Sequence, residues 1–159
     1  MTPAVQTAKR SGIKFSLHEY EHAPDSSSYG FSYGTEAAEK LGVSSAQVFK
    51  TLVVSIGDKL LAVAVLPVSA MLNTKKFARA LGVKKAQMAD PPVVERSTGY
   101  VLGGVSPLGQ KKQLKTLIDI SATSFPGIYI SAGRRGLEIE LAAHDLATLT
   151  RGEFADICK

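Results

Sequence analysis

Cysteine is almost absent from the chain: it occurs once in 159 residues, at Cys158. A single cysteine excludes an intramolecular disulfide and any metal centre built from several thiolates. The three histidines, His18, His22 and His144, show no metal-ligand spacing beyond the pair four residues apart in an expected strand. We therefore predict no metal site, and we expect Cys158 to be a thiol without a chemical role.

Long apolar runs are also missing. No run of about 18 apolar residues is present, so we expect no membrane-spanning helix. The first ten residues, MTPAVQTAKR, lack the apolar stretch of a secretory signal peptide, which leads us to expect a cytoplasmic location. The composition is nevertheless 45% hydrophobic, enough for a buried core, and the length fits one domain over residues 1–159.

The sequence carries none of the common motifs for nucleophilic, phosphate or zinc chemistry, such as G-x-S-x-G, the P-loop or H-E-x-x-H. Ser106 and Ser131 are the loop serines available as nucleophiles, and neither has a histidine base near it in the sequence. If the chain is an enzyme, we expect its chemistry to rest on positioned donors, a lysine and groups carried by the substrate, without a cofactor.

Acidic residues are fewer than basic ones, 14 against 19, which gives a net charge of +5. A basic excess of this kind suits an anionic partner such as RNA, DNA or a phosphorylated ligand. Two of the basic pairs flank glycine-rich segments and are therefore singled out from the rest: they are Lys111-Lys112 and Arg134-Arg135.

Glycine is abundant in one stretch, residues 97–112, which reads STGYVLGGVSPLGQKK. Glycine permits positive φ and close backbone approach, and Pro107 stiffens the segment. Tyr100 and the neighbouring aliphatic residues indicate a packed loop and not a flexible linker. Its backbone N–H groups could face a ligand, as in an oxyanion hole, or the stretch could simply form two tight turns.

Helical and strand patterns are interleaved along the chain, which predicts an α/β or α+β fold with a mixed sheet. Residues 48–67 predict two strands joined at Gly57-Asp58 that are covered on both faces, because both are almost continuously apolar. We predict helices over 2–12, 35–42, 73–82, 90–95 and 142–149, a helical turn at 121–125, a short helix in the tail at 152–159, strands at 15–20, 83–89, 114–119, 128–131 and 137–141, and a turn at 131–136.

Three features allow two interpretations each. Lys50 begins an apolar strand, and its residue type favours a side chain that extends to water. The alternative is a cation held beside a ligand. The aromatic residues of segment 22–34 form either a packed hinge or a stacking surface for a base or ribose. Glu138 and Glu140 share one face of their strand, where they meet either solvent or a substrate ammonium group.

The chain carries, in this order, the motifs MTPAV, YEH, VFKTL, MADP, RSTGY, GGVSPLGQKK, SAGRRG and IELAA. Together these motifs resemble the YbaK/EbsC family, which is homologous to the editing domain of bacterial prolyl-tRNA synthetases. The resemblance covers nearly the whole chain. It implies the family's editing-domain fold: a mixed, strongly curved, barrel-like sheet with helices packed around it.

The resemblance also implies a pocket for the 3′-terminal adenosine of a tRNA that carries an amino acid as an ester. Lys50 matches the family's essential lysine, and Gly103 matches the glycine of its G-x-x-x-P loop, so these two are the expected catalytic residues. One pocket position of the family matches either Tyr33 or Phe31, and Glu138 occupies a position where an aspartate is usual in the family. The expected substrate-binding residues are Tyr20, Tyr33, Thr51, Gly104, Ser106, Pro107, Ser131, Gly133 and Glu138.

The activity implied by the resemblance is deacylation of mischarged Cys-tRNA(Pro), in which the substrate's own thiolate attacks the ester carbonyl. Contacts with the acceptor-stem phosphates would come from Lys111, Lys112, Arg134 and Arg135. A prolyl-tRNA synthetase would be a partner that supplies tRNA identity. Two alternatives stay open: a deacylase for another mischarged amino acid such as alanine, and a non-catalytic module that binds aminoacyl-tRNA or an oligonucleotide.

Overall fold

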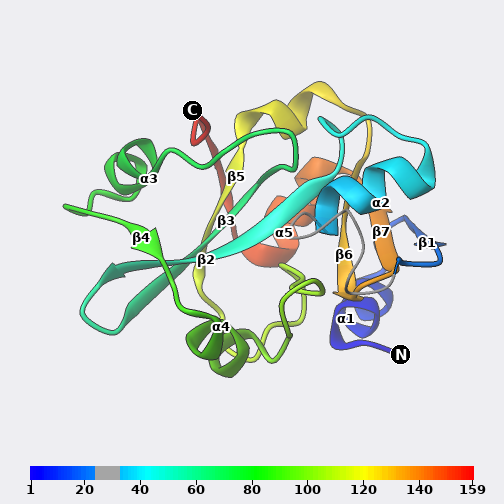
Figure 1. Cartoon of the computed structure of the whole chain (residues 1–159), viewed down its shortest axis with the longest axis horizontal. Coiled ribbons are helices and arrows are strands. Elements are labelled where there is room, and N and C mark those ends of the chain that lie inside the picture. Colours follow the sequence, from blue (N-terminus) through cyan, green and yellow to red (C-terminus); the bar gives the residue numbers. More distant parts are fainter. Residues whose placement is uncertain (24–32) are drawn as a thin grey trace.

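Five α-helices and eight strands make up the part of the chain that the structure, a computed structural model, describes: residues 1–23 and 33–159 (Figure 1). None of these helices has the length and hydropathy needed to cross a membrane. The helices are α1 (Pro3–Ser11), α2 (Tyr33–Leu41), α3 (Thr74–Leu81), α4 (Pro91–Thr98) and α5 (Ala143–Thr150), with one short 3-10 helix, η1 (Ile120–Ser124). The strands are β1 (Phe15–Glu19), β2 (Phe49–Gly57), β3 (Leu60–Pro67), β4 (Gln87–Met88), β5 (Lys115–Asp119), β6 (Ile128–Arg134), β7 (Leu137–Leu141) and β8 (Glu153–Ala155).

The strands form two sheets. The larger has the order β4-β2-β3-β5-β8, with β3–β5 and β5–β8 parallel and the other pairs antiparallel. The smaller has the antiparallel order β1-β7-β6. A parallel bridge between Val48 and Tyr129 joins them. The mixed α+β class is confirmed, but the expected barrel is wrong: within the described residues the strands form two separate sheets that this isolated bridge joins.

Strand β3 lies in the middle of the larger sheet and is buried on both faces, as its apolar sequence predicts. Val63 and Val65 enter the main core cluster, which also holds α1 and the inner face of β6. Ala64 and Leu66 point the other way, into a second cluster with Phe77 of α3. The sheet therefore separates two apolar layers, and β3 gives the neighbouring strand β2 a rigid support.

Capping residues set the helix ends where the sequence predicts them. The Thr2 and Asn73 side chains accept hydrogen bonds from the first turns of α1 and α3, and Gly12 and Gly82 end these helices with positive φ. Figure 1 shows α1 and α2 beside the smaller sheet, whereas α3 and β4 lie at the opposite end of the molecule.

Several predicted elements are wrong in type or extent. The predicted tail helix is absent; the tail forms β8, because Glu153–Ala155 pairs in parallel with the end of β5. Strand β6 runs to Arg134, so the predicted turn over 131–136 is much shorter. The strand predicted over 83–89 shrinks to β4, and α4 extends to Thr98 and takes two residues from the glycine-rich stretch. Helix α2 begins two residues earlier than predicted, at Tyr33.

Candidate functional site

Gly103 lies in a tight turn that follows α4. The Gly104 N–H donates to the Val101 carbonyl at 3.0 Å, and Gly103, the third residue of this turn, has φ +91°, which favours glycine. No described residue accepts a hydrogen bond from the Gly103 N–H. A Cβ added at this position would contact three atoms of the Tyr33 ring at 3.4 Å, so the Gly103 backbone lies against that ring.

The Tyr33 ring contacts a second group, the guanidinium of Arg135, whose Cζ lies 4.9 Å from the ring centre. Arg135 also binds Glu36 in a bidentate ion pair, with Nε 2.8 Å from Oε1 and Nη2 2.9 Å from Oε2. Burial would raise the pKa of Glu36, which is fully buried, but hydrogen bonds from Arg135 and from the Ala23 N–H hold that pKa below its usual value. We call Tyr33, Glu36, Gly103 and Arg135 the Tyr33 group.

Glu138 is a buried acid that has no partner among the described residues. It lies on β7 between His18 on β1 and Ser131 on β6, and its side chain is 5% exposed. No hydrogen bond or ion pair reaches its carboxyl group from any described residue, and burial raises its pKa to about 8. The carboxyl is therefore mostly protonated at neutral pH and would become ionised when a cation binds beside it.

Tyr20 connects Glu138 with the Tyr33 group. Burial first, and then the charge of Glu138, raises the pKa of Tyr20 to about 12; the charges of Glu36 and Arg135 also act on this pKa. Its backbone N–H is held by the Gly136 carbonyl at 3.0 Å, next to Arg135 in the β6–β7 turn. Four of the expected pocket residues, Tyr20, Tyr33, Gly103 and Glu138, are thus placed in one region.

Lys50 lies on β2, and its Nζ donates to the Ala70 carbonyl at 2.7 Å. Burial lowers the pKa of this half-buried ammonium group. An ammonium has three N–H donors, and this contact uses one of them, so donor capacity remains for an anionic or carbonyl ligand. Thr51 points to the other face of β2 from Lys50, and its Oγ1 is buried without a partner among the described residues.

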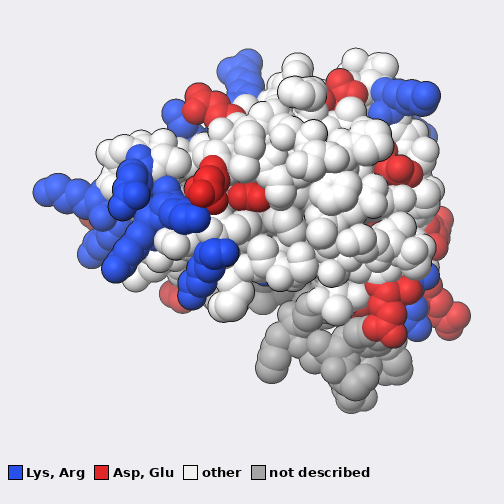
Figure 2. Space-filling model, turned by 90° about the horizontal axis from the view of Figure 1, so that it is seen from above, with Lys and Arg blue, Asp and Glu red and all other residues white. Residues whose placement is uncertain are grey.

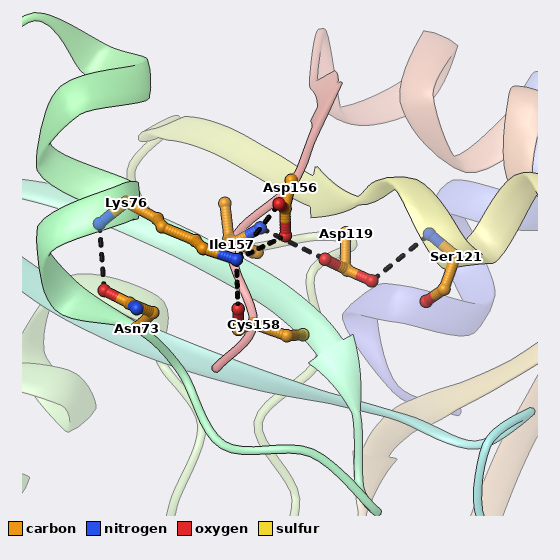
Figure 3. Close-up of polar contacts among 7 residues, drawn as sticks. All are labelled: Asn73, Lys76, Asp119, Ser121, Asp156, Ile157 and Cys158. Atoms are coloured by element: carbon orange, nitrogen blue, oxygen red, sulfur yellow. Dashed lines mark hydrogen bonds and ion pairs between the residues drawn. The ribbon is translucent and has the colours of Figure 1, made fainter.

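The segment that holds Ala70 is fixed by the C-terminal tail. The Lys159 N–H donates to the Met71 carbonyl at 2.9 Å, and the Asn73 N–H donates to the Ile157 carbonyl at 2.8 Å. Figure 3 shows Lys76 reaching the Asp156 carboxylate at 3.0 Å from the start of α3. These contacts fix the backbone around Ala70 and so fix the acceptor of the Lys50 hydrogen bond.

Asp119 anchors the same tail from the end of β5. It accepts a hydrogen bond from the Ile157 N–H at 3.2 Å through Oδ1 (Figure 3). Burial first, and then Asp119, raises the pKa of the adjacent Cys158 thiol to about 12. A protonated thiol is a poor nucleophile, so Cys158 is part of the structure around Lys50 and not a reactive group. We call Lys50, Ala70 and Cys158 the Lys50 group.

The two groups adjoin the same residue, Val68. A Cβ on Gly34 would lie 2.1 Å from Val68 Cγ1, so the start of α2 packs directly on this side chain. The Val68 N–H donates to the Val48 carbonyl at 2.8 Å, and Ala70 follows two residues later. Gly103 and Lys50 are therefore connected through Tyr33, Gly34, Val68 and Ala70.

Comparison with known proteins places this geometry in a family. The family model for the aminoacyl-tRNA editing domain matches residues 32–149, most of the chain. The chain belongs to the aminoacyl-tRNA editing domain family. Lys50, Gly103 and Glu138 all lie within the matched range.

Individual relatives agree with this membership. The editing domain is 38% identical over 157 residues to a protein of Enterococcus faecalis named "Putative Cys-tRNA(Pro)/Cys-tRNA(Cys) deacylase EbsC", covering 98% of this chain and 92% of that protein. It is 31% identical over 111 residues to a proline–tRNA ligase of Trichlorobacter lovleyi, covering 70% of this chain and 18% of the ligase. The "Crystal structure of a putative trans-editing enzyme for prolyl tRNA synthetase" has the same fold, with a TM-score of 0.83, 22% identity and coverage of 100% and 99%.

Other expected site residues of the editing domain lie apart from the Tyr33 and Lys50 groups or are occupied by internal contacts. Ser106 is fully buried, and its Oγ accepts from the Leu108 N–H. Pro107 and Lys112 line a separate cavity of about 200 Å³ near α5. Lys111 packs along Gly99.

The remaining expected residues of the described chain lie in β6 or pack against it. Gly133 has φ +106° and packs against the Tyr100 ring, and its N–H donates to Ser131 Oγ at 3.2 Å. Gly104 packs against the Arg134 backbone, and Arg134 itself pairs with Glu19 at 3.7 Å. Phe31, the competitor of Tyr33, lies outside the described residues. No cluster of three or more metal-binding side chains is found in residues 1–23 and 33–159.

Sequence reasoning missed Glu36, Ala70 and Asp119. Glu36 looks like an exposed acid in the first turn of a short helix, and its partner Arg135 lies 99 residues away. Ala70 contributes only a backbone carbonyl, which no residue type reveals. Asp119 ends a strand directly before the predicted helical turn, which is typical of a capping residue; that signal was available.

Proposed function

We propose that this editing domain is a trans-editing deacylase that removes cysteine from mischarged Cys-tRNA(Pro). Membership in the aminoacyl-tRNA editing family supports the reaction class, and the name of the Enterococcus relative supports cysteine as the amino acid. The proposed substrate implies a cytoplasmic location, where tRNA is charged.

The observation that carries the proposed mechanism is the state of the chain's own nucleophiles. The Cys158 thiol is protonated at neutral pH, Ser106 is fully buried, and the Ser131 hydroxyl has no histidine or other base bonded to it in the described part of the chain. None of these groups is activated for attack on an ester. This fits the mechanism that the family resemblance implies, in which the attacking atom belongs to the substrate, whose cysteine brings a thiol next to its own carbonyl carbon.

In the proposed reaction, the substrate thiolate forms a C–S bond with the ester carbonyl carbon and the bond from that carbon to the ribose oxygen breaks. The ribose oxygen takes up a proton, tRNA leaves, and the cyclic thiolactone is hydrolysed by water. The free Gly103 N–H would stabilise the developing oxyanion; one such donor is typically worth about 3 kcal/mol.

Lys50 and Glu138 would hold the two ends of the substrate. Lys50, with N–H donors to spare, would bind the terminal ribose or phosphate. Glu138 would bind the α-ammonium group, which would ionise the buried carboxyl and provide the partner that it lacks among the described residues. Tyr33, whose ring lies against Gly103 and Arg135, would support the wall of the pocket for the terminal adenosine.

A prolyl-tRNA synthetase is the proposed partner. A ligase of this type carries a segment similar to this chain within a much longer protein, which supports a shared task. In this proposal the synthetase would select tRNA(Pro), and the editing domain would select cysteine. Addition of prolyl-tRNA synthetase should then accelerate deacylation of Cys-tRNA(Pro) more than that of Cys-tRNA(Cys).

A panel of esters tests the proposed function. The purified protein is incubated with Cys-tRNA(Pro), S-methylcysteinyl-tRNA(Pro), Ala-tRNA(Pro) and Ser-tRNA, and the remaining ester is measured over time. Loss of the first ester only is expected, because methylation removes the nucleophile and alanine lacks it. Equal cleavage of the methylated ester would contradict the substrate-thiol mechanism.

The other outcomes identify the alternatives. Cleavage of Ala-tRNA(Pro) in place of Cys-tRNA(Pro) would show a deacylase for a different mischarged amino acid. Tight RNA binding without cleavage of any ester would show a non-catalytic binding module.

A further inference from the structure

Exposed cations gather on and directly after α3. Lys75 and Arg79 are four residues apart, so they lie on one face of this helix, and Lys84 and Lys85 follow its Gly82 cap. All four side chains are exposed. Figure 2 shows Lys and Arg concentrated at the end of the molecule that carries α3 and β4. We call Lys75, Arg79, Lys84 and Lys85 the α3 basic face.

These four charges have no acidic partner among the described residues. Three other basic side chains differ in this respect. Arg135 is paired with the buried Glu36, Arg134 with Glu19, and Lys76, on the same helix, with Asp156. The α3 basic face is therefore a surface where positive charge is not already compensated within the protein.

The α3 basic face is connected to Lys50 through Ala70. Ala70, which accepts the Lys50 hydrogen bond, is four residues before the start of α3. An eight-residue helix is only about 12 Å long. A polyanion whose end reaches Lys50 would thus meet these cations within the first few nucleotides.

We propose that the α3 basic face binds the phosphate backbone of RNA next to the 3′ end that enters the Lys50 region. This inference rests on the proposed function for the identity of the RNA, but the RNA binding itself does not require that the protein cleaves an ester. Lysine and arginine on an open surface bind phosphates without reading bases, so the contact would supply affinity and orientation and not sequence specificity.

The test variant neutralises all four side chains: Lys75→Gln, Arg79→Gln, Lys84→Gln and Lys85→Gln. Its affinity for tRNA without an attached amino acid is measured across a series of salt concentrations. The matched control is Lys9→Gln, Arg10→Gln, Lys14→Gln and Lys40→Gln, four exposed cations on α1, β1 and α2 and the segments beside them. We expect the α3 variant to bind at least about tenfold more weakly at low salt, with a log–log salt slope reduced by roughly 3, because each phosphate contact contributes about 0.7 to 0.9. The control variant should keep most of the slope.

Cleavage assays separate this inference from the proposed function. With Cys-tRNA(Pro), the α3 variant should show a raised KM, whereas with 3′-O-cysteinyl-adenosine, which lacks the RNA backbone, its kcat/KM should equal that of the wild type. An unchanged salt slope, or a larger loss in the control variant, would overturn the inference even if Cys-tRNA(Pro) is cleaved. A reduced slope in a protein that cleaves no ester would support the RNA surface and reject the deacylase.

Discussion

The Tyr33 group and the Lys50 group each hold a cation that is at least partly buried, but they bind it in different ways. Arg135 is bound by the carboxylate of Glu36, which is fully buried, so its charge is compensated inside the protein. Lys50 is bound by the neutral carbonyl of Ala70, so its charge is retained. The comparison shows that a cation can be positioned without being neutralised, and only the second arrangement leaves a full positive charge for a ligand.

The largest effect is expected from removal of this uncompensated charge. Lys50→Ala should abolish deacylation of Cys-tRNA(Pro), by at least about 1,000-fold or roughly 4 kcal/mol in transition-state stabilisation. The fold should survive, because the variant leaves no buried charge behind. Deacylation rates and thermal unfolding followed by circular dichroism measure the two effects. Full activity in Lys50→Ala would remove Lys50 from the site.

The compensated cation should behave in the opposite way. Arg135→Ala leaves the Glu36 carboxylate buried and without its main partner, which typically costs about 3–5 kcal/mol of unfolding free energy. Urea unfolding measures the loss. The double variant Glu36→Gln with Arg135→Gln is the control, and it should recover part of the stability because no unpaired charge remains. An Arg135→Ala protein as stable as the wild type would show that this pair is not structurally important.

Glu138 sharpens the comparison through pH. Its folded-state pKa is raised from 4.5 to about 8, so the folded protein binds a proton that the unfolded chain has released over this range. The resulting stabilisation is complete below about pH 4.5 and is lost as pH rises toward 8. Relative to Glu138→Gln, the wild type should lose at most about 1.4 kcal/mol of unfolding free energy per pH unit.

Urea unfolding of both proteins at pH 5, 6, 7 and 8 gives this difference. If the difference does not vary with pH, Glu138 is already ionised in the folded protein and has a partner. If the difference in unfolding free energy falls with pH as expected, adding a ligand that carries an ammonium group should shift this pH dependence to lower pH.

The smallest effect is expected at Cys158, the neighbour of Lys50. Cys158→Ser keeps a donor toward Asp119 and removes only a protonated thiol, so activity should stay within about twofold of the wild type. Deacylation of Cys-tRNA(Pro) measures it. An inactive Cys158→Ser protein that still folds would mean that the reactive sulfur belongs to the enzyme and not to the substrate.

The sequence predicts local structure well where short-range signals decide it. The caps at Thr2, Asn73 and Gly82 mark helix ends, and the apolar run of 48–67 predicts the two strands and their burial. The tail was mispredicted because pairing with β5, about 35 residues earlier, outweighs its local pattern. A short segment carries little propensity of its own, so tertiary pairing decides its structure.

The candidate site follows the same division. The turn at Gly103 could be predicted, since positive φ favours glycine. The Lys50 acceptor is a backbone carbonyl, and the Arg135 partner is 99 residues distant, so neither has a sequence signature. The basic pair that predicts phosphate contacts for Arg134 and Arg135 is visible in the sequence, whereas their acidic partners, Glu19 and Glu36, are seen only in the structure. The phosphate contacts stay a prediction.

The bridge between Val48 and Tyr129 has a mechanical consequence. Lys50 follows Val48 by two residues, and Ser131, paired with Glu138, follows Tyr129 by two residues on the parallel strand. Because side chains repeat every two residues along a strand, both positions project on the side of the seam that their preceding residues share. A small shear of one sheet against the other would therefore move the ammonium and the acid relative to each other directly, so the spacing of the two proposed substrate-binding groups depends on how stiff this junction is.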